Sequence, residues 1–160
     1  MNVQEATTRR LPDLKGRYLP ENCRETINTI LKETYGYEQF RNLEIYDDLS
    51  KGKEKLCISQ GQLIENVILE AEKAWKGETQ VDNILLTAPT GSGKSLLFQL
   101  PAIYLGKEYN LLTIVVSPLK ALIVDQVESL QELGYTRVAY ASSDLSPEQK
   151  MEVYRQVREG

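Results

Sequence analysis

One eight-residue stretch constrains the fold of this chain more than any other part of its sequence. Residues 88–95 read APTGSGKS; they follow an apolar run at 84–87 and open a helical pattern that continues to residue 105. Gly91 and Gly93 permit a tight turn that aims several backbone N–H groups at one point, where the helix dipole adds its positive end. The sequence therefore predicts a phosphate-binding loop between a strand and a helix.

The side chains of this loop suit the tail of a nucleotide triphosphate. Lys94 can reach the outer phosphates as a mobile point charge, and the Ser95 hydroxyl can ligate a bridging Mg²⁺ ion. Alternatively, the glycines only form a turn and Lys94 is solvated. In that case the match to the phosphate-loop motif, between a strand and a helix, is accidental. The predicted nucleotide-binding residues are Thr90, Gly91, Ser92, Gly93, Lys94 and Ser95. Of these, Lys94 is also the predicted catalytic residue and Ser95 the metal ligand.

Apolar runs alternate with helical patterns in the second part of the chain. The runs at 84–87, 112–117 and 136–141 are short and apolar, as strands buried on both faces of a parallel sheet are. Helical patterns at 93–105 and 119–133 lie between them. Strands separated by helices in this way predict an α/β fold: a parallel sheet with right-handed crossovers and helices on both faces.

Further helices are predicted around this region. An apolar face predicts a helix over 22–35 that Gly36 ends, and a short helix after Tyr37. Apolar residues at i, i+3, i+4 and i+7 predict a stronger helix over 60–76. The last helix begins at Ser146, where the sequence SPEQ supplies a capping serine, a first-turn proline and the glutamine of a capping box.

Composition excludes several classes of protein. Nineteen basic and 23 acidic side chains among 160 residues give a net charge of −4, so any nucleic-acid contact must be local. Cys23 and Cys57 are the only cysteines and histidine is absent, which excludes a disulfide framework and a zinc site of His and Cys. No apolar run approaches the roughly 18 residues that a membrane span requires. We expect a protein of the reducing cytoplasm with no membrane partner.

Three longer motifs surround the loop. Residues 89–102 fit the form PTGxGKSLxxQLPA, residues 115–127 fit VVSPLxxLxxDQV, and residues 138–160 carry a serine pair and LSPEQ before a helix. In this order and spacing they resemble the superfamily-two helicases, a group with DEAD/DEAH box and RecQ-like members, and the RecQ-like branch in particular. The likeness covers about residues 60–160. It implies a RecA-like P-loop domain, here partial and preceded by an N-terminal helical segment.

The resemblance implies an ATP-dependent helicase or translocase that uses ATP and Mg²⁺ and binds nucleic acid, with single-stranded DNA favoured. It also implies nucleic-acid contacts at Ser117, Pro118, Leu119 and Lys120. Taken by itself, this segment is a strand end followed by a helix start with Ser117 as its cap. Both readings can hold, because free N–H groups and Lys120 together offer a seat for one backbone phosphate. Ser142 and Ser143 are either phosphate contacts or loop hydroxyls without function.

Helicases of this kind recognise adenine through a glutamine upstream of the loop, because an amide both donates to and accepts from the base edge. The sequence QGQLIENVI resembles the motif that contains it and indicates Gln62. The sequence GYEQFR at 36–41 also resembles the stretch that normally comes just before this glutamine. Either about twenty residues are inserted between the two halves, or the likeness at 37–41 is accidental, and Gln62 is alternatively an exposed helix residue.

We divide the chain into a leader and helical segment, 1–58, and the first part of a RecA-like ATP-binding lobe, 59–160. The chain ends before the Asp-Glu motif that hydrolysis requires in this family, so we expect these 160 residues alone to be inactive. The expected partners are nucleic acid and the remainder of the helicase or a partner subunit. The alternative is a non-catalytic nucleotide-binding or assembly module that docks on a larger complex.

Overall fold

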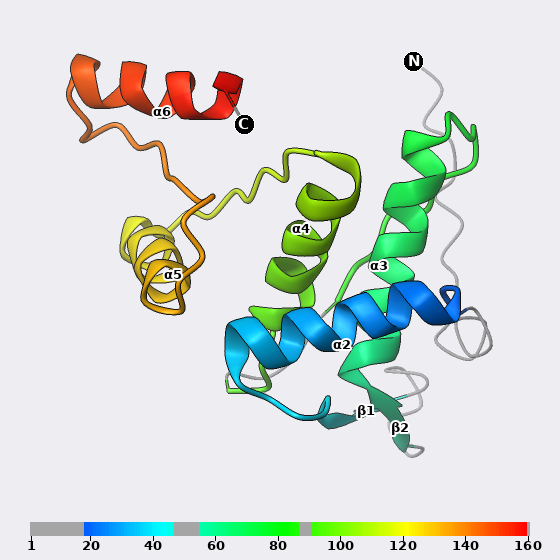
Figure 1. Cartoon of the computed structure of the whole chain (residues 1–160). Helices are drawn as coiled ribbons and strands as arrows, with labels where there is room; N and C mark the ends of the chain where they lie inside the picture. Colours follow the sequence, from blue (N-terminus) through cyan, green and yellow to red (C-terminus); the bar gives the residue numbers. More distant parts are fainter. Residues whose placement is uncertain (1–17, 47–54, 87–90, 160) are drawn as a thin grey trace.

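The computed structural model describes residues 18–46, 55–86 and 91–159, and within them five helices and two strands (Figure 1). In chain order the elements are α2 (Glu21–Tyr35), β1 (Asn42–Tyr46), β2 (Lys55–Ser59), α3 (Gln60–Trp75), α4 (Leu96–Tyr109), α5 (Lys120–Glu132) and α6 (Pro147–Glu159). None of the helices in these ranges is long and apolar enough to cross a membrane.

The core lies where α2, α3 and α4 pack together, as Figure 1 shows. Burial of each large apolar side chain stabilises the fold by about 1.5–3 kcal/mol. This packing fixes the first turn of α3 relative to the start of α4, which is the region of the predicted loop. The fully buried side chains of the three helices include Ile27, Ile30, Leu31, Ile64, Ile68, Leu100, Ile103 and Tyr104.

Most helix ends follow the sequence signals, whereas α4 begins three residues and ends four residues later than predicted. The predicted helix over 22–35 is α2, and Gly36 ends it with a φ of 69° and an N–H bond of 3.0 Å to the Lys32 carbonyl. A left-handed φ is accessible to glycine without strain. The predicted helices over 60–76, 93–105 and 119–133 are also present, as α3, α4 and α5. These predictions are confirmed.

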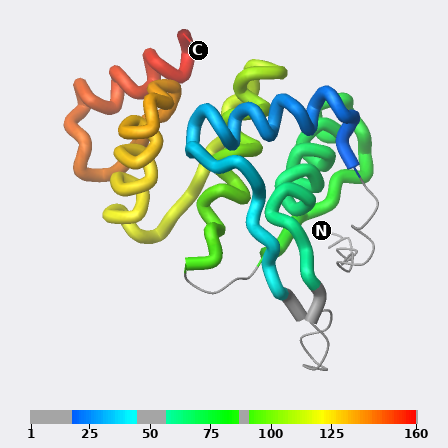
Figure 2. The backbone as a smooth tube through the Cα atoms, turned by 60° about the horizontal axis from the view of Figure 1, so that its bottom comes forward, coloured from blue at the N-terminus to red at the C-terminus, as the bar shows by residue number. Residues whose placement is uncertain are grey.

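The prediction of a short helix after Tyr37 is wrong. Strand β1 occupies this region and pairs antiparallel with β2, with Leu43 opposite Ile58 and Asn42 opposite Ser59. Alternating apolar residues in both strands form cross-strand pairs, and this pairing outweighs the weak helical spacing. Residues 47–54, which connect the two strands in the chain, lie outside the described residues. Figure 2 shows the hairpin extending away from the helices.

The predicted parallel sheet is not present in the described part of the chain. Residues 84–86, 112–117 and 136–141 contain no strand, and the sheet within the described residues is the antiparallel β1–β2 pair. A parallel strand takes its backbone hydrogen bonds from neighbouring strands, and these three segments do not pair with one another. Most apolar side chains of the first two segments are consequently exposed, with Leu85 at 92% and Val116 at 89%, whereas Leu86 and Val138 pack partly against the core.

Helices α5 and α6 lie to one side of the three-helix core in both views (Figures 1 and 2). Gln99 of α4 donates to Gln126 of α5 at 2.6 Å, and Leu130 of α5 belongs to the hydrophobic core. Helix α6 has no buried residue. Its stability therefore depends on interactions within its own sequence.

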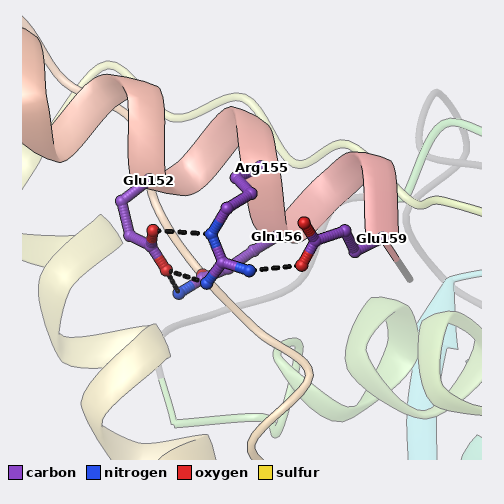
Figure 3. A network of polar contacts seen from close by, with 4 residues as sticks. All are labelled: Glu152, Arg155, Gln156 and Glu159. Atoms are coloured by element: carbon purple, nitrogen blue, oxygen red, sulfur yellow. Dashed lines mark hydrogen bonds and ion pairs between the residues drawn. The ribbon is translucent and has the colours of Figure 1, made fainter.

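The start of α6 is the predicted capping box. Ser146 Oγ accepts from the Gln149 N–H at 3.2 Å, and the Gln149 amide oxygen accepts from the Ser146 N–H at 2.8 Å. Further along, Arg155 forms ion pairs with Glu152 and Glu159 on the exposed face (Figure 3). Opposite charges three or four residues apart lie on the same face of a helix, so these pairs support α6 modestly.

Candidate functional site

The predicted phosphate loop turns at two glycines and leads directly into α4. Gly91 and Gly93 have φ values of 81° and 77°, a conformation that glycine adopts at no steric cost. The first hydrogen bonds after the turn run from the Leu96 N–H to the Gly93 carbonyl and from the Leu97 N–H to the Lys94 carbonyl. The N–H groups ahead of these have no acceptor within the helix and suit an anion.

The side chains of the loop fit a phosphate ligand. Ser92 Oγ is buried and has no hydrogen-bond partner among the described residues, so it is available to a bound polar group. Ser95 lies at the N-terminal end of α4, and its side chain makes no capping bond to the helix. Lys94 is half-buried between them. Thr90, also predicted to bind nucleotide, lies outside the described residues.

A glutamine that the sequence analysis did not single out lies against this loop. Gln60, the first residue of α3, is 2% exposed. Its side-chain nitrogen donates to the carbonyls of Ser92 and Gly93 at 3.3 and 3.5 Å. Its side-chain oxygen accepts from the Arg41 N–H at 3.2 Å. Its position two residues before Gln62, in the sequence QGQ, was the one sequence signal that pointed to it.

The two halves of the predicted adenine motif meet in the structure. The Gln60 N–H donates to the Arg41 carbonyl at 2.9 Å, so the hairpin brings the two ends of the interval between 41 and 60 together. Phe40 packs so closely on Gly61 that a Cβ there would lie 2.6 Å from the ring. A depression of about 600 Å³, lined by residues 36–42, opens beside this junction. Gln62 is half-buried in the same first turn of α3.

The second predicted site, Ser117 to Lys120, lies at the start of α5. Ser117 does not cap the helix: its hydroxyl accepts from the Leu119 N–H at 3.3 Å, and Leu119 occupies the N-cap position without a side-chain bond. The predicted capping role is therefore wrong, because Ser117 lies two residues too early. Pro118 and Leu119 are exposed. This leaves the N-terminal N–H groups of α5 without a side-chain cap.

Lys120 joins this segment to the loop that carries the serine pair. Its ammonium group lies 2.6 and 2.8 Å from the two carboxylate oxygens of Asp144. The Asp144 N–H donates to Ser142 Oγ at 3.4 Å, and Ser143 Oγ donates to the same carboxylate at 3.3 Å. The neighbouring Lys120 lowers the pKa of Asp144. Sequence analysis missed Asp144, since nothing in its spacing linked it to Lys120.

The comparison with known families covers the part of the chain that contains the phosphate loop and the segment from Ser117 to Lys120. The sequence model of the DEAD/DEAH box helicase family matches residues 60–159. No solved structure matches the chain.

Individual relatives agree with this match. The chain is 32% identical over 132 residues to an "ATP-dependent DNA helicase RecQ" from Synechocystis, covering 82% of this chain and 21% of that protein. It is 32% identical over 136 residues to an "ATP-dependent DNA helicase Q-like 5" from Arabidopsis thaliana, covering 85% and 11%. It is 42% identical over 74 residues to an "ATP-dependent DNA helicase Q4" from mouse, covering 46% and 6%. The chain thus spans about a fifth or less of the length of these relatives.

Proposed function

Because this chain belongs to the DEAD/DEAH box helicase family, we propose that it forms the nucleotide-binding part of an ATP-dependent DNA helicase or translocase. The observation that carries the proposal is the loop at 91–95, with its two left-handed glycines and its position at the start of α4. The three relatives are named ATP-dependent DNA helicases, which supports DNA as the substrate. We also propose a domain boundary near residue 58, and the start of the family match at residue 60 supports it.

In this proposal the loop residues hold the phosphates of ATP. Backbone N–H groups at the start of α4 donate to phosphate oxygens, and Lys94 offsets their negative charge. Ser92 Oγ donates the hydrogen bond that it lacks within the described residues. Ser95 is the proposed Mg²⁺ ligand, and the ion, when bound, supplies positive charge that bridges the phosphates. Thr90 completes the proposed set from outside the described residues.

The adenine base is assigned to the junction of the hairpin and α3. Gln62 is the proposed recognition residue, because an amide both donates to and accepts from the base edge. The depression lined by residues 36–42 adjoins the first turn of α3, and the exposed ring of Tyr37 lies in its wall. An aromatic ring at this place offers a stacking surface for a base.

The nucleic-acid backbone is assigned to the start of α5. Uncapped N–H groups there, together with Lys120, offer donors for one phosphate. Ser142 and Ser143 lie on the adjoining loop and add hydroxyl groups to the same surface. Contacts of this kind hold the backbone without reading the sequence of bases.

The RecA-like sheet is assigned to the three apolar segments at 84–86, 112–117 and 136–141. The exposed apolar residues of the first two segments support this, since pairing into strands would remove them from water. We propose that neighbouring strands in the full-length protein pair with them. That arrangement would be the parallel sheet that the alternation of the sequence predicts.

The decisive experiment is a steady-state ATPase assay of the full-length protein with and without single-stranded DNA. The proposal expects hydrolysis that rises when the DNA is added, because a motor couples the two ligands. Binding of ATP without hydrolysis under either condition would contradict it. That outcome would favour a non-catalytic assembly module instead.

A further inference from the structure

The side-chain amide of Gln60 connects three peptide groups from two separate segments. Its oxygen accepts from the Arg41 N–H, and its nitrogen faces the carbonyls of Ser92 and Gly93. The two kinds of partner fix which end of the amide is oxygen, because an N–H requires an acceptor and a carbonyl requires a donor. At 2% exposure, water does not replace these partners. The group is therefore a built-in brace between residue 41 and the loop.

The geometry of the peptide bond gives this brace a consequence for ligand binding. A peptide is planar and trans, so its C=O and its N–H point in opposite directions. The Ser92 carbonyl belongs to the same peptide as the Gly93 N–H, and the Gly93 carbonyl to the same peptide as the Lys94 N–H. Holding both carbonyls toward Gln60 therefore turns these two N–H groups to the opposite side of the loop.

Gly93 shows how closely the two groups approach. A Cβ at residue 93 would lie 2.6 Å from the Gln60 side-chain nitrogen, well inside contact distance, and the φ of 77° already favours glycine. The loop thus lies directly on the amide. In a loop with two glycines, the peptide planes rotate easily unless other groups hold them. The Leu96 N–H also donates to the Gly93 carbonyl at 3.2 Å, so Gln60 adds a second contact at that peptide and holds the Ser92 carbonyl as well.

We propose that Gln60 is the positioning residue of the phosphate loop: it orients the peptides at 92–93 and 93–94 so that their N–H groups face the nucleotide phosphates. This inference rests on the proposed function, and it deepens it by assigning a role to a residue that does not itself touch the ligand. Preorganised donors bind a charged group without first being reoriented. Loss of the brace lowers phosphate affinity by letting the loop sample other orientations.

Two substitutions separate the parts of the brace. Gln60→Met keeps the shape and removes every hydrogen bond of the side chain. Gln60→Glu keeps an acceptor for the Arg41 N–H, but it places a carboxylate against the carbonyls of Ser92 and Gly93. If the loop contacts matter, the glutamate variant binds phosphate no better than the methionine variant.

Gln99→Met is the matched control. Gln99 is also a buried glutamine, 8% exposed, and it also joins two groups through its amide. Its partners are the Tyr35 hydroxyl at 3.2 Å and the Gln126 side chain at 2.6 Å, both away from the loop carbonyls. This variant measures the effect of losing a buried amide as such.

The experiment measures two ligands on the full-length protein. Titration calorimetry gives the Kd of MgATP, and competition gives the inhibition constant of inorganic tripolyphosphate, which has phosphates and no base. We expect Gln60→Met and Gln60→Glu to raise both constants by a common factor of about ten, the scale of one hydrogen bond to a charged group. We expect Gln99→Met to lower thermal stability and leave both constants unchanged.

Other results would overturn the inference. One such result is an unchanged inhibition constant of tripolyphosphate in folded Gln60→Met or Gln60→Glu protein. That result would show that Gln60 affects only the binding of the adenine base or the stability of the protein. If wild-type protein binds neither MgATP nor tripolyphosphate, the proposed function fails and the inference fails with it. Normal binding by wild type and by both Gln60 variants would overturn the inference alone.

Discussion

Lys120 and Asp144 form a two-point ion pair across the predicted nucleic-acid surface, with the ammonium nitrogen 2.6 and 2.8 Å from the two carboxylate oxygens. Both side chains are more than half exposed. A backbone phosphate that approaches Lys120 meets this carboxylate first. Asp144 is therefore a competitor for the same cation, although solvent screens an exposed pair of this kind and makes it weak.

Replacing Asp144 with Asn should strengthen the binding of single-stranded DNA. Removing the competing charge frees Lys120, and the modest strength of an exposed pair sets the gain at about two- to fivefold. Fluorescence anisotropy with a labelled oligonucleotide measures it. Glu38→Gln, which breaks an exposed pair with Lys32 elsewhere on the protein, is the matched control and should have no effect. Weaker binding by Asp144→Asn would mean that the carboxylate orients Lys120 for the phosphate.

Replacing Lys120 with Ala should weaken the same binding and reduce its dependence on salt. One lost phosphate contact lowers the slope of log affinity against log salt by about 0.7 for a single strand. Anisotropy titrations at several salt concentrations give the slope. Lys32→Ala removes another exposed, paired lysine and should leave it unchanged. An unaltered slope for Lys120→Ala would exclude a phosphate contact there.

Gly61 should tolerate no larger residue, although it lies in a helix. An added Cβ would lie 2.6 Å from the Phe40 ring, so Gly61→Ala should destabilise the protein by about 1–3 kcal/mol through overpacking. Gly106→Ala is the matched control in α4, where the nearest atom lies at 3.7 Å. It should stabilise by about 0.4–1 kcal/mol. Denaturant unfolding measures the free energy of unfolding of both variants. Equal changes in this free energy would contradict the packing of Phe40 on α3.

Replacing Ser146 with Ala should destabilise α6 and leave the other helices largely unaffected. The serine hydroxyl caps this helix, and loss of such a cap costs about 1 kcal/mol. Since α6 buries nothing, no tertiary packing compensates for the loss. Hydrogen exchange should quicken over Pro147–Glu159 and stay unchanged over α4. Ser129→Ala, at an exposed position within α5, serves as control, and unchanged exchange in α6 of the Ser146 variant would contradict the capping role.

Local signals in the sequence predicted the helices well. The end of α2 at Gly36 and the capping box at Ser146 depend on residues within one or two turns, and such patterns are legible without the fold. The strands depend on distant partners. Leu43 and Ile58 form a pair only because the hairpin closes, and the segment at 112–117 has the apolar character of a strand without a neighbour in the described residues.

The site shows the same division between local and distant information. The left-handed turns at Gly91 and Gly93 follow from the loop sequence itself. The contacts of Gln60 with the loop and of Lys120 with Asp144 join residues more than twenty positions apart. A single sequence gives no spacing rule for such pairs, so they emerge only when the helices are packed.

The central claim is that the loop at 91–95 holds the phosphates of ATP with the help of Lys94. Titration calorimetry of MgATP against full-length protein tests it most directly, with Lys94→Ala as the variant and Lys107→Ala, an exposed lysine in the last turn of α4, as control. We predict saturable binding by wild type and the control, and at least about tenfold weaker binding by Lys94→Ala at equal thermal stability. Equal affinity in all three proteins, or no binding by wild type, would contradict the account.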